Sequence, residues 1–535
     1  MSQNKQEWGT RLGVILAVSG SAVGLGNFLR FPGQAAQHGG GAFMIPYFCA
    51  LLLLGIPIGW AEWTMGRYGG RKGFHSAPAI MGVVGRGAVA RYLGIIGVLI
   101  PLAVYFYYVF IEGWCLAYAW EYAKAIFGTP ALGIDSQAAI EAQSAKSAEF
   151  FASFTGRAQD GVMLGGTIVE SVVFWAIVFV LNVWFVFRGL SKGIEKFCTW
   201  AMPSMAVCAL IVLGYVLTLE PDPATPERTV TAGLGYMWNP DWNALRDPGA
   251  WLAAAGQIFF SLSVGFGVII NYASYMKRKD DLVLSGLTAS STNELFEVGF
   301  GGMITLTSAF IFLGATGTAA AVATGSFGLG FTTLPVVFAN MPAGQWIGMV
   351  WFFMLFLAAI TSSLSMLQPA VAFVEEALGT SRAKATGLIT GIALIGSLWV
   401  IWFSKDLAAL ATIDDWVGTF LIVVLAAVQV ICFGWVFGMD RGMREAHEGA
   451  HLRIPGFIRF VIKYIAPLYL LIAIGMFCKN NLGNWIEAAR ANPVQRNTLI
   501  LIGLVIVFLA VLTHIGTKRW RAAGLDVDGE RPPQD

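Results

Sequence analysis

Several polar or charged side chains, most of them of types that can bind a cation, stand inside otherwise apolar stretches of this chain. They are Asn27, Arg30, Tyr107, Tyr108, Gln257, Ser261, Ser263, Asn293, Glu294, Glu297, Thr361, Ser362 and Ser363. Amide, hydroxyl and carbonyl oxygens suit a hard cation such as sodium, and they add little fixed charge. Intramembrane Asn, Arg and Glu are functional-site candidates, whereas Ser and Thr commonly bond back to their own helix. The residue types indicate an ion site, with back-bonding as the alternative for each hydroxyl.

Two glycine-rich segments lie beside these side chains and interrupt long apolar stretches. They are Val23-Gly24-Leu25-Gly26 and Val264-Gly265-Phe266-Gly267. A helix broken inside a bilayer leaves backbone groups unpaired, at a cost of several kcal/mol each, unless something polar binds them. Paired breaks in two halves are typical of secondary transporters, which bind their cargo there. Glycine used for close helix packing is the alternative, and the matched pair favours the site.

The composition predicts an all-α polytopic membrane protein. Hydrophobic residues make up 56% of the chain, charged residues make up 12%, and the mean hydropathy is +0.67. About twelve apolar runs reach the roughly 20 residues that span a bilayer. We place these spans near 11–36, 42–68, 88–124, 166–187, 194–218, 250–275, 284–315, 343–375, 384–404, 410–437, 456–479 and 495–516.

The distribution of charge predicts the orientation. Basic clusters such as 67–72, 188–196 and 277–279 alternate across the spans, so both termini are expected to be cytoplasmic, with an even number of spans. The first ten residues are polar, which argues against a cleavable signal. The cysteines and histidines show no ligand spacing, and no phosphate-binding or hydrolase motif is present, so neither an enzyme nor a nucleic-acid partner is expected.

The two breaks predict an inverted repeat, because five spans in each half force opposite orientations. We expect a cytoplasmic segment at 1–10, repeat one at 11–218, an extracellular connecting loop at 219–247 and repeat two at 248–437. Two further spans lie in 438–518, and 519–535 forms a cytoplasmic tail. The uncharged loop 314–342 is predicted to fold back as a hairpin over the outer side.

The motifs of the chain resemble the neurotransmitter:sodium symporter family, and its bacterial leucine transporter most of all. The resemblance rests on segments 8–32, 39–46, 62–70, 188–195, 256–263, 284–288 and 361–369, and it spans nearly the whole chain apart from 125–165 and the extreme tail. It implies the LeuT-like fold, with about twelve transmembrane helices in a 5+5 inverted repeat and broken helices one and six. It also implies a bacterial inner-membrane location.

The resemblance further implies two co-transported sodium ions and one small-molecule substrate. The first sodium site would use Ala22, Asn27, Ser261, Asn293 and the substrate's carboxylate. The second would use Gly20, Val23, Ala358, Thr361 and Ser362. The substrate would contact Ala22, Leu25, Gly26, Val104, Tyr108, Phe260, Ser261, Ser263, Phe266, Ser362 and Met366. The outer gate would be Arg30 with Asp414, with Tyr108 and Phe260 as lids. The inner gate would be Lys5 with Glu376, near Trp8 and Tyr275.

Five departures from the leucine transporter bear on the pocket and the inner gate. Ser21, Ser261 and Met366 replace Asn, Thr and Ile, which leaves the pocket volume open. At the inner gate, Lys5 and Glu376 replace Arg and Asp. Lysine is a point charge and cannot form the bidentate pair that arginine forms with a carboxylate, so we expect a weaker inner gate.

The resemblance predicts a sodium symporter that imports a neutral, apolar, Leu- or Met-like L-amino acid by alternating access. Gly24 stands where the family's monoamine carriers have Asp, so the substrate itself is expected to bring the anion. Glu297 stands where chloride-dependent relatives have serine, and a carboxylate there predicts chloride-independent transport with proton counter-movement.

Several alternatives remain open at this point. A carrier of the same fold for betaine or nucleobases, or a sensor that binds without transport, would share these features. Arg30 could be an interfacial cation, and Glu297 could be held ionised by structural hydrogen bonds. Glu62 and Glu112 could serve structure by binding freed backbone amides near the breaks. Besides the lipid bilayer and the substrate no partner is expected, and a monomer and a dimer both stay open.

Overall fold

The computed structural model describes residues 7–165 and 169–531, and within these ranges the chain is helical. The only β-type pairing there is an isolated bridge between Gly40 and Pro240. This confirms the predicted all-α class.

Two spans are broken. In the first, α1 (Arg11–Ala22) leads into a π-helical turn (Gly26–Arg30) and α2 (Phe31–Gln37), and the two parts are bent by 47°. In the second, α12 (Pro248–Ser261) and α13 (Val268–Ala273) are separated by the segment 262–267. Both interruptions lie where the glycine pattern predicted them.

The other helices that could cross a membrane are continuous or kinked. They contain α3 (Met44–Ala50) with α4 (Ile56–Arg71), α6 (Ala88–Leu93) with α7 (Ile96–Ala125), α9 (Glu170–Phe187), α10 (Lys196–Leu217), α14 (Leu282–Glu294) with α15 (Met303–Ala323), α18 (Gly344–Leu378), α19 (Arg382–Trp402), α20 (Ala408–Ile413) with α21 (Ile422–Ile431) and α22 (Met439–His447), α23 (Ile458–Phe460) with α24 (Ala466–Phe477) and α25 (Gly483–Ala491), and α26 (Pro493–Ala522). Within the described ranges ten helices are long and apolar enough to cross a membrane, or eleven if the bent pair counts as one span. The predicted number of about twelve is reached when α12 and α13 count as one broken span.

Short helices cover the ends of the bundle. They are α5 (Ala77–Val84), α8 (Ile140–Thr155), α11 (Val230–Trp238), α16 (Gly325–Gly328) and α17 (Leu334–Asn340). The predicted hairpin 314–342 begins with a kink at Gly314 (φ 70°), and α16 then packs against the π-helical turn of the first broken span.

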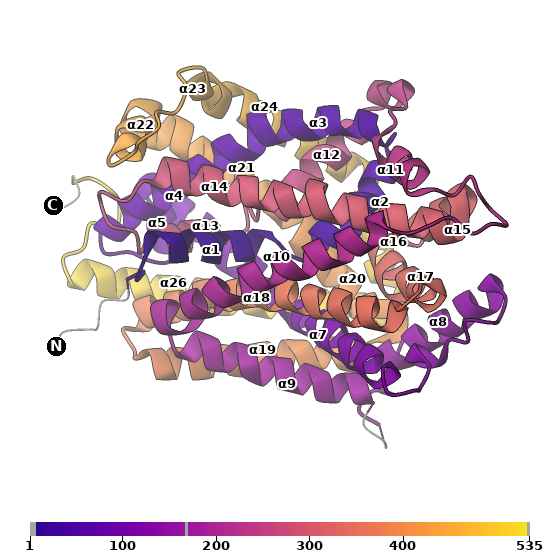
Figure 1. Ribbon diagram of the computed structural model, residues 1–535. Coiled ribbons are helices and arrows are strands. Elements are labelled where there is room, and N and C mark those ends of the chain that lie inside the picture. Colours follow the sequence, from indigo (N-terminus) through magenta and orange to yellow (C-terminus); the bar gives the residue numbers. More distant parts are fainter. Residues whose placement is uncertain (1–6, 166–168, 532–535) are drawn as a thin grey trace.

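Helices α7 and α18 form the centre of the bundle and pack against each other along their length (Figure 1). Most of their side chains are apolar, and buried residues lie on every face, as expected for helices surrounded by other helices. Helices α9, α10, α24 and α26 instead expose residues such as Val180, Ile211, Leu468 and Leu504, which suits contact with lipid. The broken spans lie against the central pair, so the site is built on rigid elements.

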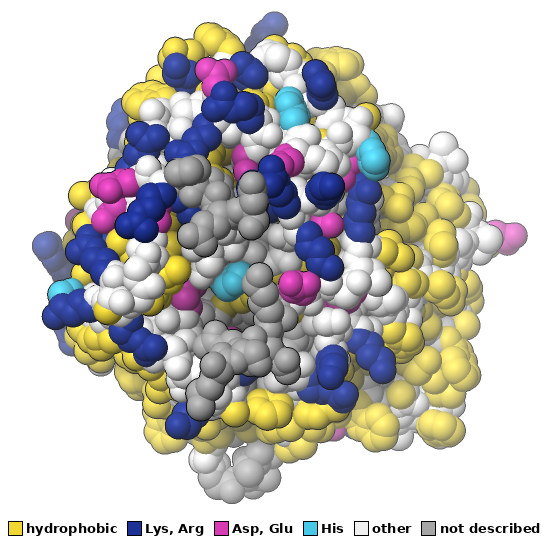
Figure 2. All heavy atoms as spheres, turned by 90° about the vertical axis from the view of Figure 1, so that its left-hand side faces the viewer, with side chains coloured by type: hydrophobic (Ala, Val, Ile, Leu, Met, Phe, Trp, Pro, Cys, Tyr) yellow, Lys and Arg dark blue, Asp and Glu magenta, His cyan; other side chains and the backbone are white. Residues whose placement is uncertain are grey.

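Both described chain ends lie on the same end of the bundle (Figure 1), and that end carries many Lys and Arg side chains (Figure 2). The C-terminal segment is fixed there: Trp520 Nε1 donates to the Glu376 carbonyl at 3.2 Å, and Lys72 pairs with Asp526. Burial alone would raise the pKa of the Asp526 carboxyl, but hydrogen bonds from Lys72 and from backbone N–H groups outweigh it and lower that pKa.

Candidate ion and substrate site

The first break is held open by a side chain of its own segment. Helix α1 ends at Ala22, and Val23 takes an extended conformation (φ −74°, ψ 102°). The freed Gly24 N–H donates to Asn27 Oδ1 at 2.8 Å. A Cβ at Gly24 would lie 3.0 Å from both Tyr108 Oη and Ser362 Oγ, so glycine lets this backbone approach α7 and α18 closely. At this break glycine therefore permits both the interruption of the helix and its close packing against α7 and α18.

The second break lies beside the first. Ser263, Gly265 and Gly267 have φ of 54°, 72° and 92°, in the left-handed region. Gly265 N–H donates to Glu62 Oε1 at 3.3 Å, so Glu62 binds a freed backbone amide, as one of its two interpretations expected. Ser263 Oγ donates to the Ser21 carbonyl at 3.1 Å and joins the two breaks directly.

A buried amide and carboxylate cluster, which we call the asparagine cluster (Asn27, Ser261, Asn293 and Glu297), connects both breaks to α14. Asn27 Nδ2 donates to Asn293 Oδ1 at 2.8 Å and to Glu297 Oε2 at 3.3 Å. Asn293 Nδ2 lies 3.0 Å from Glu297 Oε2 and 3.3 Å from Ser261 Oγ. Three of the four side chains expected at the first sodium site therefore meet, and the fourth residue, Ala22, ends α1 next to them.

Glu297 is the charged centre of this cluster. The Gln257 amide donates to its second carboxylate oxygen, and the side chain is completely buried. Gln257 stood out in the sequence as a polar residue near the second break, but its bond to Glu297 was not foreseen. A carboxylate that accepts from three amides can offset the charge of a nearby cation.

A second group, which we call the carbonyl cluster (Gly20, Val23, Ala358, Thr361 and Ser362), joins the first break to α18. Ser362 Oγ lies 3.2 Å from the Gly20 carbonyl, 3.4 Å from that of Val23 and 3.1 Å from that of Ala358. One hydroxyl proton can satisfy only one of these acceptors. The convergence of several carbonyls with a hydroxyl, with no charged side chain in the set, is a donor set that fits sodium.

Thr361, the other hydroxyl of the carbonyl cluster, bonds within its own helix. Its hydroxyl donates to the Leu357 and Ala358 carbonyls at 3.0 and 3.1 Å, which is the back-bonding alternative considered for span hydroxyls. Ser363 points elsewhere, to Glu112 Oε2 at 2.6 Å and Asn182 Oδ1 at 2.7 Å. Glu112 thus binds side chains, and the described contacts give it no freed backbone amide near the breaks.

The residues expected to line the side-chain pocket come from two helix faces and from both breaks. Val104 and Tyr108 are one turn apart on α7, and Ser362 and Met366 are one turn apart on α18, so each pair shares a face. Leu25 N–H donates to Tyr108 Oη at 3.4 Å. Val104, Phe266 and Met366 are buried, and a Cβ at Gly26 would lie 2.7 Å from the Phe260 ring. The walls of this region carry no charged side chain.

On the outer side, the two expected gate residues have different partners. The Arg30 guanidinium lies 4.6 Å over the centre of the Phe260 ring, while Asp414 accepts from Tyr107 Oη at 2.6 Å. No ion pair joins Arg30 to Asp414 in the described part of the chain. The role of Tyr107, as opposed to Tyr108, was not predicted.

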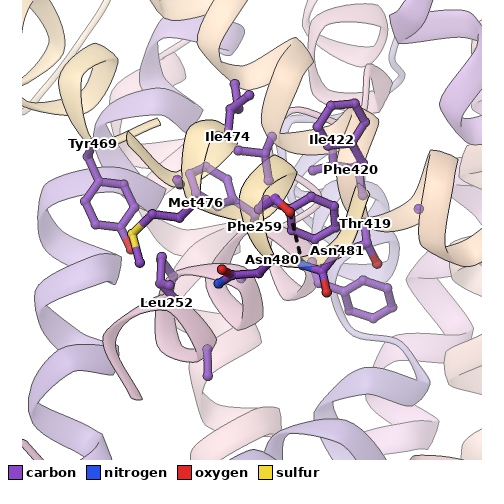
Figure 3. A pocket seen from close by; sticks show the side chains of 18 of the residues that line it. Leu252, Phe259, Thr419, Phe420, Ile422, Tyr469, Ile474, Met476, Asn480 and Asn481 are labelled. Carbon is purple, nitrogen blue, oxygen red and sulfur yellow. Dashed lines mark hydrogen bonds between the residues drawn. The ribbon is translucent and has the colours of Figure 1, made fainter. Parts of the chain in front are cut away.

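A cavity of about 300 Å³ opens above Arg30 and Phe260. Figure 3 shows apolar side chains around it, including Phe259, Phe420, Ile474 and Met476, with the amides of Asn480 and Asn481. Phe260, one of the two expected lids, is part of its lining.

The end of the bundle that holds the chain termini is closed by packing. Trp8 is buried, its Nε1 donates to the Tyr272 carbonyl at 3.0 Å, and Tyr275 stacks on His75 with 4.3 Å between ring centres. Glu376 accepts from the backbone N–H groups of His75 and Ser76, both at 2.8 Å. Lys5, its expected partner, lies outside the described residues.

A half-buried carboxylate, Glu294, which the sequence offered only as a general ion-site candidate, lies beside the asparagine cluster. Glu294 Oε2 accepts from Tyr47 Oη at 2.7 Å, and Glu294 Oε1 lies 3.4 Å from Asn293 Nδ2. Its position next to Asn293 was visible in the sequence, but its partner on α3 was not.

Comparisons with known proteins agree with this geometry. The chain is 28% identical over 517 residues to an uncharacterized sodium-dependent transporter of Methanocaldococcus jannaschii, covering 96% of this chain and 97% of the relative. It is 26% identical to the sodium- and chloride-dependent glycine transporter 1 of Xenopus laevis, over 86% of this chain and 76% of that protein. The crystal structure of MhsT in complex with L-phenylalanine superposes with a TM-score of 0.72 at 26% identity, covering 88% of this chain and 99% of MhsT.

The family model agrees over almost the full length. The model of the sodium:neurotransmitter symporter family matches residues 5–517, a range that includes both breaks, the asparagine cluster and the carbonyl cluster. The members of this family are transporters and not enzymes. This chain, a multi-pass membrane protein with a LeuT-like fold, belongs to the sodium:neurotransmitter symporter family.

Proposed function

We propose that this transporter couples the inward movement of two sodium ions to the import of a neutral, apolar L-amino acid by alternating access. The observation that carries the proposal is the convergence of two oxygen-rich clusters on one broken helix. The asparagine cluster holds one ion and the carbonyl cluster holds the other. Both ions are substrates that move with the amino acid.

Gly24 supports an amino acid over an amine. A Cβ there would already lie 3.0 Å from two hydroxyls, so an aspartate in that place would need the neighbouring hydroxyls to move. The substrate must then supply the anionic ligand of the first sodium ion through its own carboxylate. Because ion and substrate share that contact, each raises the affinity of the other by the same factor.

The neutral wall supports an apolar side chain. Val104 and Phe266 offer hydrocarbon surface, and the unbranched thioether of Met366 adapts to different shapes. Leu and Met are the expected substrates. MhsT was solved with L-phenylalanine, which supports extending the range to an aromatic amino acid.

The basic end of the bundle is proposed to face the cytoplasm of a bacterial cell, because Lys and Arg gather there (Figure 2). Both termini would then be cytoplasmic and the cavity above Phe260 extracellular. In this arrangement the outer side is accessible, while Trp8 and the contacts of Glu376 close the inner side.

We assign the outer gate to Arg30 and Asp414; the assignment is supported by the position of the Arg30 guanidinium over the Phe260 ring and by the bond from Tyr107 Oη to Asp414. Closure would bring the guanidinium from Phe260 to the carboxylate. Arg30→Ala is expected to cut uptake about tenfold while equilibrium substrate binding changes less than about twofold. Scintillation proximity binding and uptake, measured on the same protein, check this. Unchanged uptake would leave Arg30 as an interfacial cation.

Uptake into proteoliposomes tests the function as a whole. An inward sodium gradient should drive accumulation of labelled Leu, and replacement of sodium by potassium should abolish it. Unlabelled Met and Phe should compete, whereas Glu, Lys and a decarboxylated amine should not. Binding without accumulation would indicate a sensor, and competition by betaine or a nucleobase alone would place the substrate in another class.

A further inference from the structure

An open cavity of about 610 Å³ lies at the basic end of the bundle, away from both ion clusters. Arg71, Arg441, Arg444, Arg453 and Arg459 line it; we call it the basic cavity. It lies between the end of α4, helix α22 and the segment that leads into α23, on the end that also holds the chain termini (Figure 1). Two glutamates are its only acidic lining residues in the described part of the chain, so positive charge is in excess.

The two glutamates are already engaged by arginines on α4. Glu445 binds Arg67 Nε at 3.1 Å and Arg71 Nη1 at 2.7 Å, and Glu448 binds Arg71 Nη1 at 3.1 Å. Within the described ranges, Arg444 and Arg453 have no acidic partner. The cavity therefore presents guanidinium groups whose charge is not neutralised by the protein.

The walls are preorganised. Arg441 lies 4.8 Å over the Tyr68 ring and 4.9 Å over the Phe437 ring. Ile454 N–H donates to His447 Nε2 at 3.0 Å, which fixes the segment that carries Arg453. A planar guanidinium held in this way matches the paired oxygens of a phosphate group.

A stripe of exposed apolar side chains begins next to the cavity. Phe457, Phe460, Tyr464 and Leu468 are 62%, 58%, 49% and 62% exposed. They recur at helical spacing on either side of Arg459, from the start of the span that includes α23 and α24. Large apolar side chains on one face of a span contact lipid tails. A molecule with a phosphate head and acyl chains would therefore fit the cavity and the stripe together.

We propose that the basic cavity binds the phosphate of an anionic phospholipid of the surrounding leaflet, with its acyl chains along the stripe 457–468. Arg444 and Arg453 contact the phosphate oxygens, Arg459, which pairs with Asp440 at 2.9 Å, lies at the rim, and Arg441 closes the inner wall. This site is separate from the ion and substrate clusters and does not depend on the identity of the transported amino acid.

Lipid retention by the purified full-length protein tests the proposal. The protein in detergent is titrated with phosphatidylglycerol or with phosphatidylcholine of the same acyl chains, and native mass spectrometry counts the bound lipids. Wild type should retain phosphatidylglycerol in preference. In the double variant Arg444→Gln/Arg453→Gln, half-saturation should need about tenfold more phosphatidylglycerol, with phosphatidylcholine retention unchanged.

A matched control removes the same charge from another part of the same face. Arg188→Gln/Lys192→Gln should bind phosphatidylglycerol like wild type. An equal loss in this control would overturn the assignment to the cavity, because it would show a diffuse surface charge effect. Wild-type retention in Arg444→Gln/Arg453→Gln would overturn it as well.

Inorganic phosphate separates the two sources of the same anion. If millimolar phosphate binds and phosphatidylglycerol is not preferred over phosphatidylcholine, the lipid assignment is overturned in favour of a free phosphate site. Arg453→Gln alone, in an exposed segment outside the helices, should show a smaller loss in the same direction. It keeps the test valid if the double variant folds poorly.

Discussion

The asparagine cluster and the carbonyl cluster flank the same broken helix, but they hold charge differently. Glu297 puts a carboxylate into the first, where Asn27, Asn293 and Gln257 donate to it. The second contains only carbonyls and hydroxyls around Ser362. A cation in the first cluster therefore meets a fixed charge, whereas one in the second relies on dipoles. Because of this difference, we expect only the ion in the first cluster to be coupled to the substrate and to anions.

The first prediction removes the side chain that holds the asparagine cluster together. Asn27→Ala loses the bonds to Gly24 N–H, to Asn293 and to Glu297, and it leaves buried groups unpaired at about 1–3 kcal/mol each. Sodium and substrate affinities should fall together, by about 100-fold. Sodium-dependent substrate binding measures both.

Asn340→Ala is the matched control, because Asn340 is an amide on α17 that bonds Gln143 far from either cluster. Its sodium dependence should stay like that of wild type. A substrate affinity that falls in Asn27→Ala without a change in sodium affinity would contradict a shared contact.

The second prediction removes the charge that separates the two clusters. Glu297→Ser should make uptake depend on chloride, with about a 30-fold drop when chloride is replaced by gluconate, while wild type works equally in both. We expect this because a chloride ion between Gln257 and Asn293 can replace the negative charge of the lost carboxylate.

Proton movement gives a second readout for Glu297. A carboxylate that offsets sodium can return protonated when the carrier is empty, so uptake by wild type should be faster with an alkaline interior and Glu297→Ser should lose that response. Equal uptake by the variant in chloride and in gluconate would contradict the prediction that the Glu297 carboxylate replaces chloride. Glu297 would then be a carboxylate held for structure.

The third prediction addresses the uncharged cluster. Ser362→Ala removes the hydroxyl that faces the Gly20, Val23 and Ala358 carbonyls, and the sodium concentration for half-maximal uptake should rise about tenfold. Substrate affinity at saturating sodium should change less than the sodium requirement, because this ion does not touch the substrate carboxylate and Ser362 is one of many expected substrate contacts.

Ser363→Ala is its control, since that neighbouring hydroxyl bonds Glu112 and Asn182 on the other side of α18. If Ser363→Ala raised the sodium requirement as much as Ser362→Ala, the second ion would not lie at Ser362.

The interruptions of the helices were predictable because they are local. Val23 to Gly26 and Val264 to Gly267 carry their conformational preference in their own residues, and the structure breaks both helices there. The apolar runs likewise predicted the spans. The register of Ser362 against the Gly20 carbonyl came from a family resemblance and not from composition.

The partners across helices could not be predicted. Tyr107 and Tyr108 are adjacent in the sequence and point about 100° apart, so only the rotation of α7 decides which one meets Asp414. The bonds from Gln257 to Glu297, from Tyr47 to Glu294 and from Lys72 to Asp526 join residues 40 to 454 positions apart. Such pairs depend on packing that no single segment encodes.

The smallest expected effect decides whether Thr361 is a ligand or only bonds back to its helix. Its hydroxyl faces the Leu357 and Ala358 carbonyls, as in any back-bonded threonine, yet a Cβ at Gly20 would lie only 3.1 Å from the Thr361 Cβ. Thr361→Ser keeps the oxygen and should change the sodium requirement by less than about twofold. Thr361→Val keeps the shape and removes the oxygen. If Thr361 contributes a ligand to the carbonyl cluster, sodium titration of uptake should show a rise in Thr361→Val close to that of Ser362→Ala. A requirement like that of wild type in both Thr361 variants would leave the ion to Ser362 and the three carbonyls.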